Sequence, residues 1–281
     1  MNEGRCLCGG VTWALTAEPF AAYNCYCKMC QKVHGTPFGT YYLVRPDQIR
    51  WTSETDTIVR YRSSHFLTRC SCDGCGSVVP FLGRDGERWA APAGCHDHGK
   101  KADCNIFVAD NAPWHEVTGD LPRHDAYPVE TGYPSVDDKP LAAGPEGVVR
   151  GSCLCGAIAF HVTEPIKVAH NCHCWRCRHA RAAAHASNGF TSFDGVGFLK
   201  GEDHLKSYKV PEARYFTQVF CDVCSSAMPR RDAERKIAVI PLGSLDDDPG
   251  VKPVDHKFVA YKAGWHDITD DLPRFEEAPP G

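Results

Sequence analysis

Long apolar runs and basic segments are absent from this chain of 281 residues. No window approaches the roughly 18 consecutive apolar residues that a membrane-crossing helix needs, so we expect no membrane span. No basic tail or basic helix is visible and the net charge is −4, which argues against nucleic acid as the main partner. The first residues, MNEGRCLCGG, lack the charged and then apolar pattern of an export signal, so we expect a cytoplasmic protein.

Cysteine, in contrast, is abundant. The chain has 17 cysteines, which is an odd number. Because disulfides do not persist in a reducing cytosol, clustered cysteines there indicate metal binding or catalysis. A disulfide scaffold is the less favoured alternative.

The chain repeats itself, which indicates two copies of one domain. The paired segments are GRCLCGGVTW and GSCLCGAIAF, NCYCKMC and NCHCWRC, CDGCGSVVP and CDVCSSAMP, and PWHEVTGDLPR and GWHDITDDLPR. Between them lies 125–149, which contains four prolines and three glycines and has no sustained periodicity. We therefore predict a first domain over 1–124, a linker over 125–149 and a second domain over 150–281.

Short segments rich in β-branched and aromatic residues predict a mainly β fold in each copy, with metal sites that tie the sheets together. The predicted strands lie within 9–17, 36–44, 56–63, 107–112, 156–163 and 236–242. The one helix that the sequence predicts is short and lies within 174–186, in copy two.

Two cysteine patterns recur in both copies, and the first predicts a closed four-cysteine site. A C-x-C pair in an extended chain points both thiols to one face, and a C-x-x-C pair lies on a tight turn. Together the two pairs provide the four thiolates of a structural zinc site, for which iron is the main competitor. The predicted ligands are Cys6, Cys8, Cys72 and Cys75 in copy one, and Cys153, Cys155, Cys221 and Cys224 in copy two.

The second pattern, C-x-C-x-x-C, provides three ligands with no repeated fourth. It comprises Cys25, Cys27 and Cys30, and Cys172, Cys174 and Cys177. A zinc ion held by three thiolates has net charge −1 and one open position, which favours a soft sulfur ligand and thiol chemistry over hydrolysis. These six cysteines are our candidate catalytic residues. The alternative is a set of reduced thiols, or a zinc that only stabilises a loop.

The combined motifs resemble those of the glutathione-dependent formaldehyde-activating enzyme and centromere protein V family. In copy one they are G-x-C-x-C-G at 4–9, C-x-C-x-x-C at 25–30, C-x-x-C-G at 72–76 and W-x-x-x-x-x-D-L-P at 114–122. The resemblance implies two tandem zinc-containing domains of stacked antiparallel sheets, each with a structural zinc and a second zinc on the triad. It also implies a carbon–sulfur lyase activity that joins glutathione to formaldehyde to give S-hydroxymethylglutathione.

Two functions remain open at this point. One is an enzyme in which the triad zinc captures a small thiol, such as glutathione, for attack on a small aldehyde. The other is a non-catalytic thiol carrier or zinc-stabilised interaction module. A role on chromatin or microtubules is a third alternative, which the missing basic extension weakens.

Copy two departs from the motifs at two glycines. Ala182 and Ser225 stand where copy one has Gly35 and Gly76. Since glycine is required where φ is positive or a ligand comes close, these changes favour copy one as the working copy. Three arginines near the second triad, Arg176, Arg178 and Arg181, favour copy two for an anionic substrate instead.

The remaining candidates have ordinary interpretations. Cys70, Cys95 and Cys104 have no partners in copy two, and we expect small, partly buried residues. A solvated loop is the favoured interpretation of His96 and His98, over a metal site. A core Trp with a hydrogen-bonded His explains Trp114 with His115 and Trp265 with His266. Surface arginine is the favoured interpretation of Arg62, Arg69, Arg178 and Arg181, each of which could alternatively bind a carboxylate.

Overall fold

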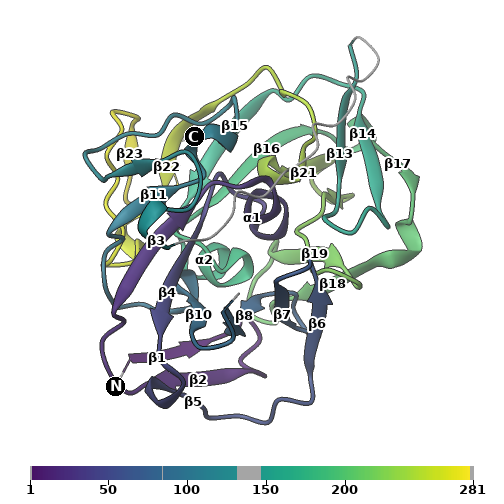
Figure 1. Cartoon of the computed structure of the whole chain (residues 1–281). Helices are drawn as coiled ribbons and strands as arrows, with labels where there is room; N and C mark the ends of the chain where they lie inside the picture. The colour runs from purple at the N-terminus through teal and green to yellow at the C-terminus, as the bar shows by residue number, and fades with distance from the viewer. Residues whose placement is uncertain (1, 84, 132–146, 279–281) are drawn as a thin grey trace.

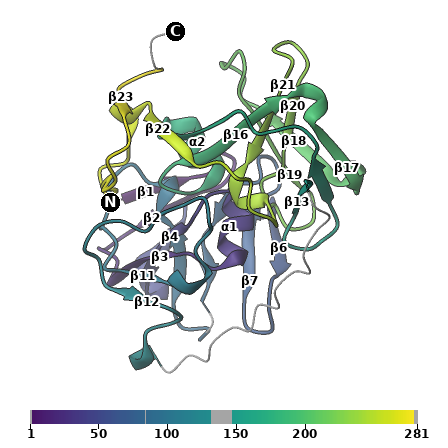
Figure 2. The ribbon, with the colours of Figure 1, turned by 90° about the horizontal axis from the view of Figure 1, so that it is seen from above.

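The computed structural model describes residues 2–83, 85–131 and 147–278. It confirms a mainly β protein of two similar halves, which follow one another along the chain (Figure 1). Seen from above, the strands of copy one and those of copy two lie on opposite sides of the molecule (Figure 2). We keep the terms copy one and copy two for these halves.

Copy one contains a six-stranded sheet in the order β12-β11-β3-β4-β10-β9 and two three-stranded sheets, β1-β2-β5 and β6-β7-β8. The small sheets are antiparallel, as the resemblance implies, whereas in the large sheet β11 runs parallel to both β3 and β12. The strands are β1 (Asn2–Arg5), β2 (Thr12–Leu15), β3 (Ala21–Cys25), β4 (Gly39–Val44), β5 (Ile49–Trp51), β6 (Ile58–Arg62), β7 (Thr68–Cys72), β8 (Val78–Val79), β9 (Phe81–Leu82), β10 (Trp89–Pro92), β11 (Cys104–Ile106) and β12 (Arg123–His124).

Copy two repeats this plan with the sheets β20-β21-β16-β15-β22-β23, β13-β14-β17 and β18-β19. Here β22 runs parallel to β15 and β23. The strands are β13 (Val149–Ser152), β14 (Ala159–Val162), β15 (Val168–Cys172), β16 (Ala186–Ser192), β17 (Val196–Lys200), β18 (Leu205–Lys209), β19 (Thr217–Cys221), β20 (Arg230–Asp232), β21 (Ile237–Pro241), β22 (Pro253–Lys257) and β23 (Arg274–Phe275).

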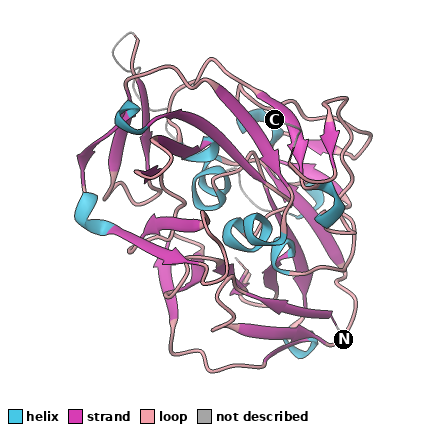
Figure 3. Cartoon of the chain, turned by 180° about the vertical axis from the view of Figure 1, so that it is seen from behind, coloured by secondary structure: helices cyan, strands magenta, loops and turns pink. Residues whose placement is uncertain are grey.

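Within the described residues each copy has one short α-helix, α1 (Lys28–His34) and α2 (Trp175–Arg181), and the two lie near the middle of the molecule (Figure 3). The sequence predicted only α2. Helix α1 could have been predicted as well, because it occupies the equivalent position in the repeat. Short 3-10 turns complete the elements: η1 (Pro46–Gln48), η2 (Ala93–Cys95), η3 (Val108–Asp110), η4 (Val129–Thr131), η5 (Phe193–Gly195), η6 (Glu202–His204), η7 (Leu242–Ser244) and η8 (Val259–Tyr261).

The strand predicted at 107–112 is wrong. The strand in this region is β11, which ends at Ile106, and the chain then turns through Phe107 at φ 59° into η3. The β-branched and aromatic residues of segment 107–112 suggested a strand. A left-handed residue followed by a 3-10 turn cannot continue a sheet ladder.

The two copies exchange a tryptophan. Trp265 of copy two is 3% exposed and packs in the core of copy one, where its Nε1 donates to the carbonyl of His96 (3.1 Å). Trp114, the equivalent residue of copy one, is also 3% exposed and packs in the core of copy two. The hydrophobic cores therefore depend on each other, although the repeat alone predicts two separate ones.

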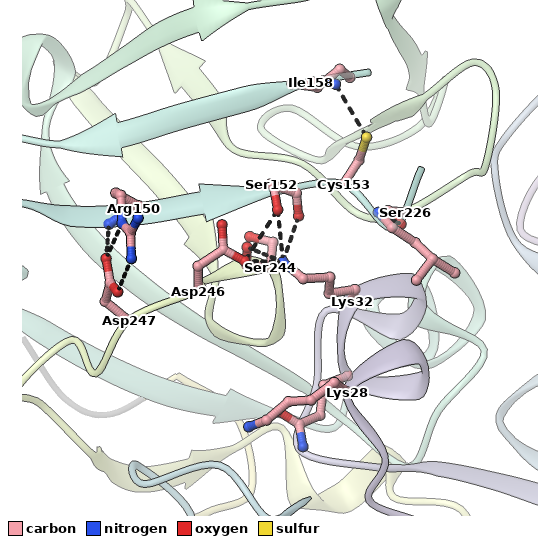
Figure 4. Close-up of polar contacts among 12 residues, drawn as sticks. Lys28, Lys32, Arg150, Ser152, Cys153, Ile158, Ser226, Ser244, Asp246 and Asp247 are labelled. Atoms are coloured by element: carbon pink, nitrogen blue, oxygen red, sulfur yellow. Dashed lines mark hydrogen bonds and ion pairs between the residues drawn. The ribbon is translucent and has the colours of Figure 1, made fainter. Parts of the chain in front are cut away.

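Polar contacts also join the copies. Lys32 of α1 forms an ion pair with Asp246 and donates to the backbone carbonyl of Ser152 at 3.0 Å (Figure 4). A second contact runs from copy two to copy one: Arg178 of α2 donates to Asp97 at 2.7 Å. Lys32, Asp246 and Arg178 are largely buried, so each of them requires its partner from the other copy, whereas Asp97 is exposed.

The predicted linker is described only in part, because 132–146 lie outside the described residues. Before that gap, the ring of Tyr127 packs against Phe107 at a centroid distance of 4.8 Å. Among the described helices, none is long and apolar enough to cross a membrane.

Candidate metal centres

The structure brings the predicted four-cysteine sets together, and we call each set a quartet. In both quartets all four Sγ atoms lie within 4.8 Å of one another. The Sγ atoms of Cys8 and Cys72 are 3.6 Å apart, and those of Cys155 and Cys221 are 3.7 Å apart. Four thiolates at the usual Zn–S length of about 2.3 Å would lie about 3.8 Å apart, so the quartets are suited to a tetrahedral metal such as zinc.

Backbone groups around each quartet stabilise negative sulfur. The N–H groups of Val11 and Gly10 donate to Cys6 and Cys8 at 3.3 and 3.4 Å. The N–H of Ile158 donates to Cys153 at 3.2 Å, as Figure 4 shows. Such donors fix the thiolates in place without adding charge to the site.

The three-cysteine sets, which we call triads, also converge, with all Sγ atoms of a triad within 4.8 Å. In copy one Cys25 ends β3, Cys27 precedes α1 and Cys30 lies in the first turn of α1. Hydrogen bonds with Cys25 and Cys27 and the nearby Arg69 guanidinium hold the pKa of Cys30 well below its usual range. In copy two the same kind of contact, from Cys172 and Cys177, lowers the pKa of Cys174 to about 3.

Each triad opens onto a cavity. The cavity at Cys25, Cys27 and Cys30 has a volume of about 280 Å³ and the one at Cys172, Cys174 and Cys177 about 480 Å³. Three thiolates beside open space are the donor set of a metal that keeps a free position.

The walls of the two cavities differ in charge. Aromatic rings dominate the copy-one cavity: Phe20, Tyr23, Tyr41, Phe66, Phe81 and Tyr127 line it. Arginines dominate the copy-two cavity: Arg176, Arg181, Arg214, Arg230 and Arg235 line it. The first cavity is suited to apolar groups and the second to anions.

One buried arginine accompanies each triad, but from a different position. In copy one Arg69 of β7 lies 3.4 Å from the Sγ of Cys30 and also donates to Tyr41 at 3.0 Å. In copy two Gln218 occupies the position of Arg69, and Arg181 of α2 occupies that of His34. Arg181 donates to Asn188 at 3.3 Å through Nη2, while its Nη1 has no hydrogen-bond partner in the described part of the chain. Burial lowers the pKa of Arg181 to about 10, which still leaves it charged at neutral pH.

The interpretation of the arginines and of His96 as surface residues needs correction. Arg69, Arg178 and Arg181 are buried, whereas Arg62 is exposed as expected. Arg178 pairs with Asp97 between the copies and does not line the copy-two cavity. His96 is fully buried and accepts from the Nε1 of Trp13 at 2.9 Å, so only His98 lies in a solvated loop.

The steric argument from the glycines is also wrong. Gly35 and Gly76 have φ values of 64° and 72°, and Ala182 and Ser225 keep this left-handed conformation at 49° and 56°. Neither pair lines a triad cavity. A Cβ on Gly35 would instead lie 2.8 Å from Pro241, in the other copy. The glycines serve the turns and the contact between copies.

The three cysteines that have no partner in copy two belong to neither kind of cluster, although Cys104 also lines the copy-one triad cavity. Cys95 is 1% exposed and packs in the core, and Cys70 and Cys104 are partly buried. Cys70 is not among the converging Sγ atoms of either copy-one cluster.

Fold and site together define a duplicated β protein with two cysteine clusters per copy that are suited to metal binding. The model of the family "Glutathione-dependent formaldehyde-activating enzyme" matches residues 1–110 and 148–261. The chain therefore belongs to this family and carries two tandem copies of its domain.

Individual relatives are distant. An uncharacterized lyase of Schizosaccharomyces pombe is 27% identical over 85 residues, which is 30% of this chain and 60% of that protein. A Halomonas elongata protein whose name refers to a glutathione-dependent formaldehyde-activating enzyme is 26% identical over 131 residues, 43% of this chain and 81% of that protein. The crystal structure of a Rhodobacter sphaeroides protein covers 37% of this chain and 97% of its own, at 20% identity and a TM-score of 0.30.

Proposed function

We propose that this protein forms a carbon–sulfur bond between a small thiol of the glutathione type and a small aldehyde such as formaldehyde, at a triad. The observation that carries the proposal is the second triad, whose converging thiols open onto a cavity of about 480 Å³ beside a buried arginine. Membership of the family and the names of the relatives support the same chemistry.

The quartets and the triads have different roles in this proposal. The quartets would hold structural zinc ions, and Cys172, Cys174 and Cys177 would hold a further zinc ion. That zinc would supply a positive centre that favours the thiolate form of an incoming thiol. Cys25, Cys27 and Cys30 form the equivalent set in copy one.

The side chains around the second triad bind and orient the substrate. Arg181, fixed by Asn188, presents its free Nη1 to a carboxylate of the thiol. The thiol sulfur then forms a bond to the aldehyde carbon, and the C=O double bond becomes a single bond. The proton that leaves the thiol ends on the former carbonyl oxygen, so the product is a hydroxymethyl thioether and no oxidant is needed.

A pair of triad variants tests which copy binds glutathione. We expect Cys174→Ser to abolish glutathione binding in calorimetry, and Cys27→Ser to retain it, because five arginines line the copy-two cavity. Arg181→His introduces the copy-one residue and should weaken binding roughly tenfold, the usual scale for losing one charge-assisted hydrogen bond.

Activity is measured as formaldehyde consumption against the spontaneous reaction, followed by NMR with identification of the product. Acceleration by the wild-type protein that disappears in Cys174→Ser supports the enzyme. If the protein binds glutathione but neither the wild type nor any variant accelerates formaldehyde consumption, the protein is a thiol carrier. Loss of glutathione binding in Cys27→Ser alone would move the site to copy one.

A further inference from the structure

The two triad cavities occupy equivalent places in the repeat, but their walls differ position by position. Five wall positions in copy one carry apolar or aromatic side chains: Tyr23, Met29, Tyr41, Phe81 and Ile106. The equivalent positions line the copy-two cavity and carry polar or charged side chains: His170, Arg176, Asn188, Arg230 and Lys257. Because all five exchanges run in the same direction, the two cavities should select different classes of ligand.

The aromatic wall of the copy-one cavity is continuous. The ring centroid of Tyr41 lies 5.5 Å from that of Phe81 and 6.0 Å from that of Tyr23. The hydroxyl of Tyr41 is engaged by Arg69 at 3.0 Å and by the Nε2 of His34 at 2.6 Å. Tyr41 therefore presents ring surface to a ligand and not a free hydroxyl.

The charged residues that line the copy-one cavity are already paired. Arg88 forms an ion pair with Asp85, and Asp103 pairs with Lys100 at 2.7 Å. Arg69 donates through both of its terminal nitrogens to groups of copy one, and only its Nε lacks a partner in the described residues. A carboxylate is best held by two parallel N–H groups, which one Nε does not supply. The cavity is therefore poorly suited to the carboxylates of a glutathione-type thiol.

The size and the borders of the cavity favour a compact apolar group. Its volume of about 280 Å³ is at the lower end of the range of about 300 to 1,000 Å³ that is usual for ligand pockets. Two further aromatic residues that line it, Phe20 and Phe66, are exposed. Apolar surface thus extends from the cavity to solvent, and an apolar group that entered would be removed from water.

We propose that the copy-one cavity binds a small, uncharged thiol with a compact apolar group, so that the two copies receive two different classes of thiol. The inference rests on the proposed function, because it takes both triads to be thiol sites. Sulfur is expected in the ligand since the three converging thiols of Cys25, Cys27 and Cys30 suit a metal that favours a soft sulfur partner. The apolar group would lie against Tyr41 and Phe81.

The test uses cyclohexanethiol, its oxygen analogue cyclohexanol, and glutathione, each titrated by calorimetry into the full-length zinc-loaded protein. We expect one cyclohexanethiol per chain, with an affinity that saturating glutathione leaves unchanged, because the two thiols occupy different copies. Cyclohexanol should bind at least roughly tenfold more weakly, since it has the same ring but no soft sulfur.

Variants assign each thiol to a copy. Cys27→Ser should abolish cyclohexanethiol binding and retain glutathione binding, and Cys174→Ser should do the reverse. Met29→Arg gives copy one the residue of copy two and should weaken cyclohexanethiol binding by roughly tenfold, because apolar contact is lost. Leu199→Arg, at an exposed apolar residue outside both cavities, is the matched control and should bind both thiols as the wild type does.

The outcomes separate this inference from the proposed function. Absence of cyclohexanethiol binding to the wild type, its displacement by glutathione, or equal binding of cyclohexanol each overturns the inference, and none of these results depends on a variant folding. Retention of cyclohexanethiol binding in Cys27→Ser also overturns it. Failure of glutathione to bind, while cyclohexanethiol binds and is lost in Cys27→Ser, would instead overturn the function proposed for copy two.

Discussion

At the scale of single residues, the cysteines divide by what surrounds them. Each quartet offers four sulfurs that receive backbone N–H groups, whereas each triad offers three sulfurs beside a cavity. A metal in an enclosed four-ligand site contributes to folding, since the unfolded chain cannot offer that site. The two kinds of cluster should therefore respond differently to the same substitution.

We predict that Cys72→Ser lowers the free energy of unfolding by on the order of 5 kcal/mol, while Cys27→Ser changes it by about 1 kcal/mol. Thermal and denaturant unfolding of the metal-loaded protein measure both. Cys70→Ser is the matched control, since Cys70 lies two residues from Cys72 on the same strand but outside the quartet. A greater loss in Cys27→Ser than in Cys72→Ser would reverse our assignment of structural sites.

Acid should destabilise the protein through His115, whose ring is largely enclosed between the copies. Burial lowers the pKa of His115 to about 4, from an ordinary value of about 6.5. Above pH 6.5 the ring is neutral in both states; below it the unfolded chain takes up a proton that the folded chain excludes. Stability is therefore lost as pH falls from 6.5 towards 4, by roughly 1–2 kcal/mol from this residue at pH 5.

The measurement for this prediction is urea unfolding at pH 7 and pH 5. The variant His115→Gln cannot titrate, so it should lose about 1–2 kcal/mol less than the wild type over the same interval. Equal losses in both proteins would show that His115 takes up its proton in the folded state as readily as in the unfolded state. The comparison is between variants because acid also protonates cysteine ligands in every version of the chain.

At the scale of elements, the internal repeat predicted more of the structure than the residue types that are typical of strands did. The fourteen repeated cysteines and their spacings predicted which of them the structure brings together, because those spacings follow from local backbone geometry. The same reasoning missed α1, which is too short to show periodicity, and placed a strand at 107–112, where Phe107 turns the chain. The prediction of helices and strands from residue types fails where the backbone angle of a single residue decides whether a strand continues.

The buried arginines and the buried histidines of copy two could not be recognised from local sequence. Arg69 and Arg181 are buried only because distant strands close over them. His173, His185 and His256 meet only once β15, β16 and β22 are assembled. Aligning the copies residue by residue would have revealed the pattern of histidines, but not that its members are neighbours.

The turn after α1 gives a prediction about these elements. Gly35→Ala should lower stability by about 2 kcal/mol or more, because the residue keeps φ 64° and its new Cβ would lie 2.8 Å from Pro241. Glutathione binding should not change, since Gly35 lines neither triad cavity. Denaturant unfolding and thiol calorimetry on the same variant separate the two effects.

Ala182→Gly is the matched control for that experiment. It relieves a left-handed alanine but removes a buried methyl group, so the net change should be within about 1 kcal/mol. A loss of thiol affinity in Gly35→Ala at unchanged stability would restore the glycine to the binding site.

At the scale of the whole molecule, the exchanged tryptophans make the halves interdependent. We predict that Trp265→Ala costs about 3–5 kcal/mol, the usual range for a buried tryptophan, and destabilises copy one although the change is in copy two. The separate fragments 1–131 and 148–281 should each be unstable alone and should form a folded pair when mixed. Circular dichroism and size-exclusion chromatography test this, and a stable monomeric fragment 1–131 would contradict it.

Covalent connection of two interdependent halves has a consequence for inheritance. Where two separate identical chains meet on an axis, every substitution appears on both sides at once, so the two faces must suit each other in matching pairs. Here each side of the interface between the copies is encoded by its own stretch of the chain, and His185 can face Phe38, its equivalent in the repeat. Dilution cannot part the two faces, because one chain carries both. Duplication has thus given this protein an interface whose two sides can be altered one at a time.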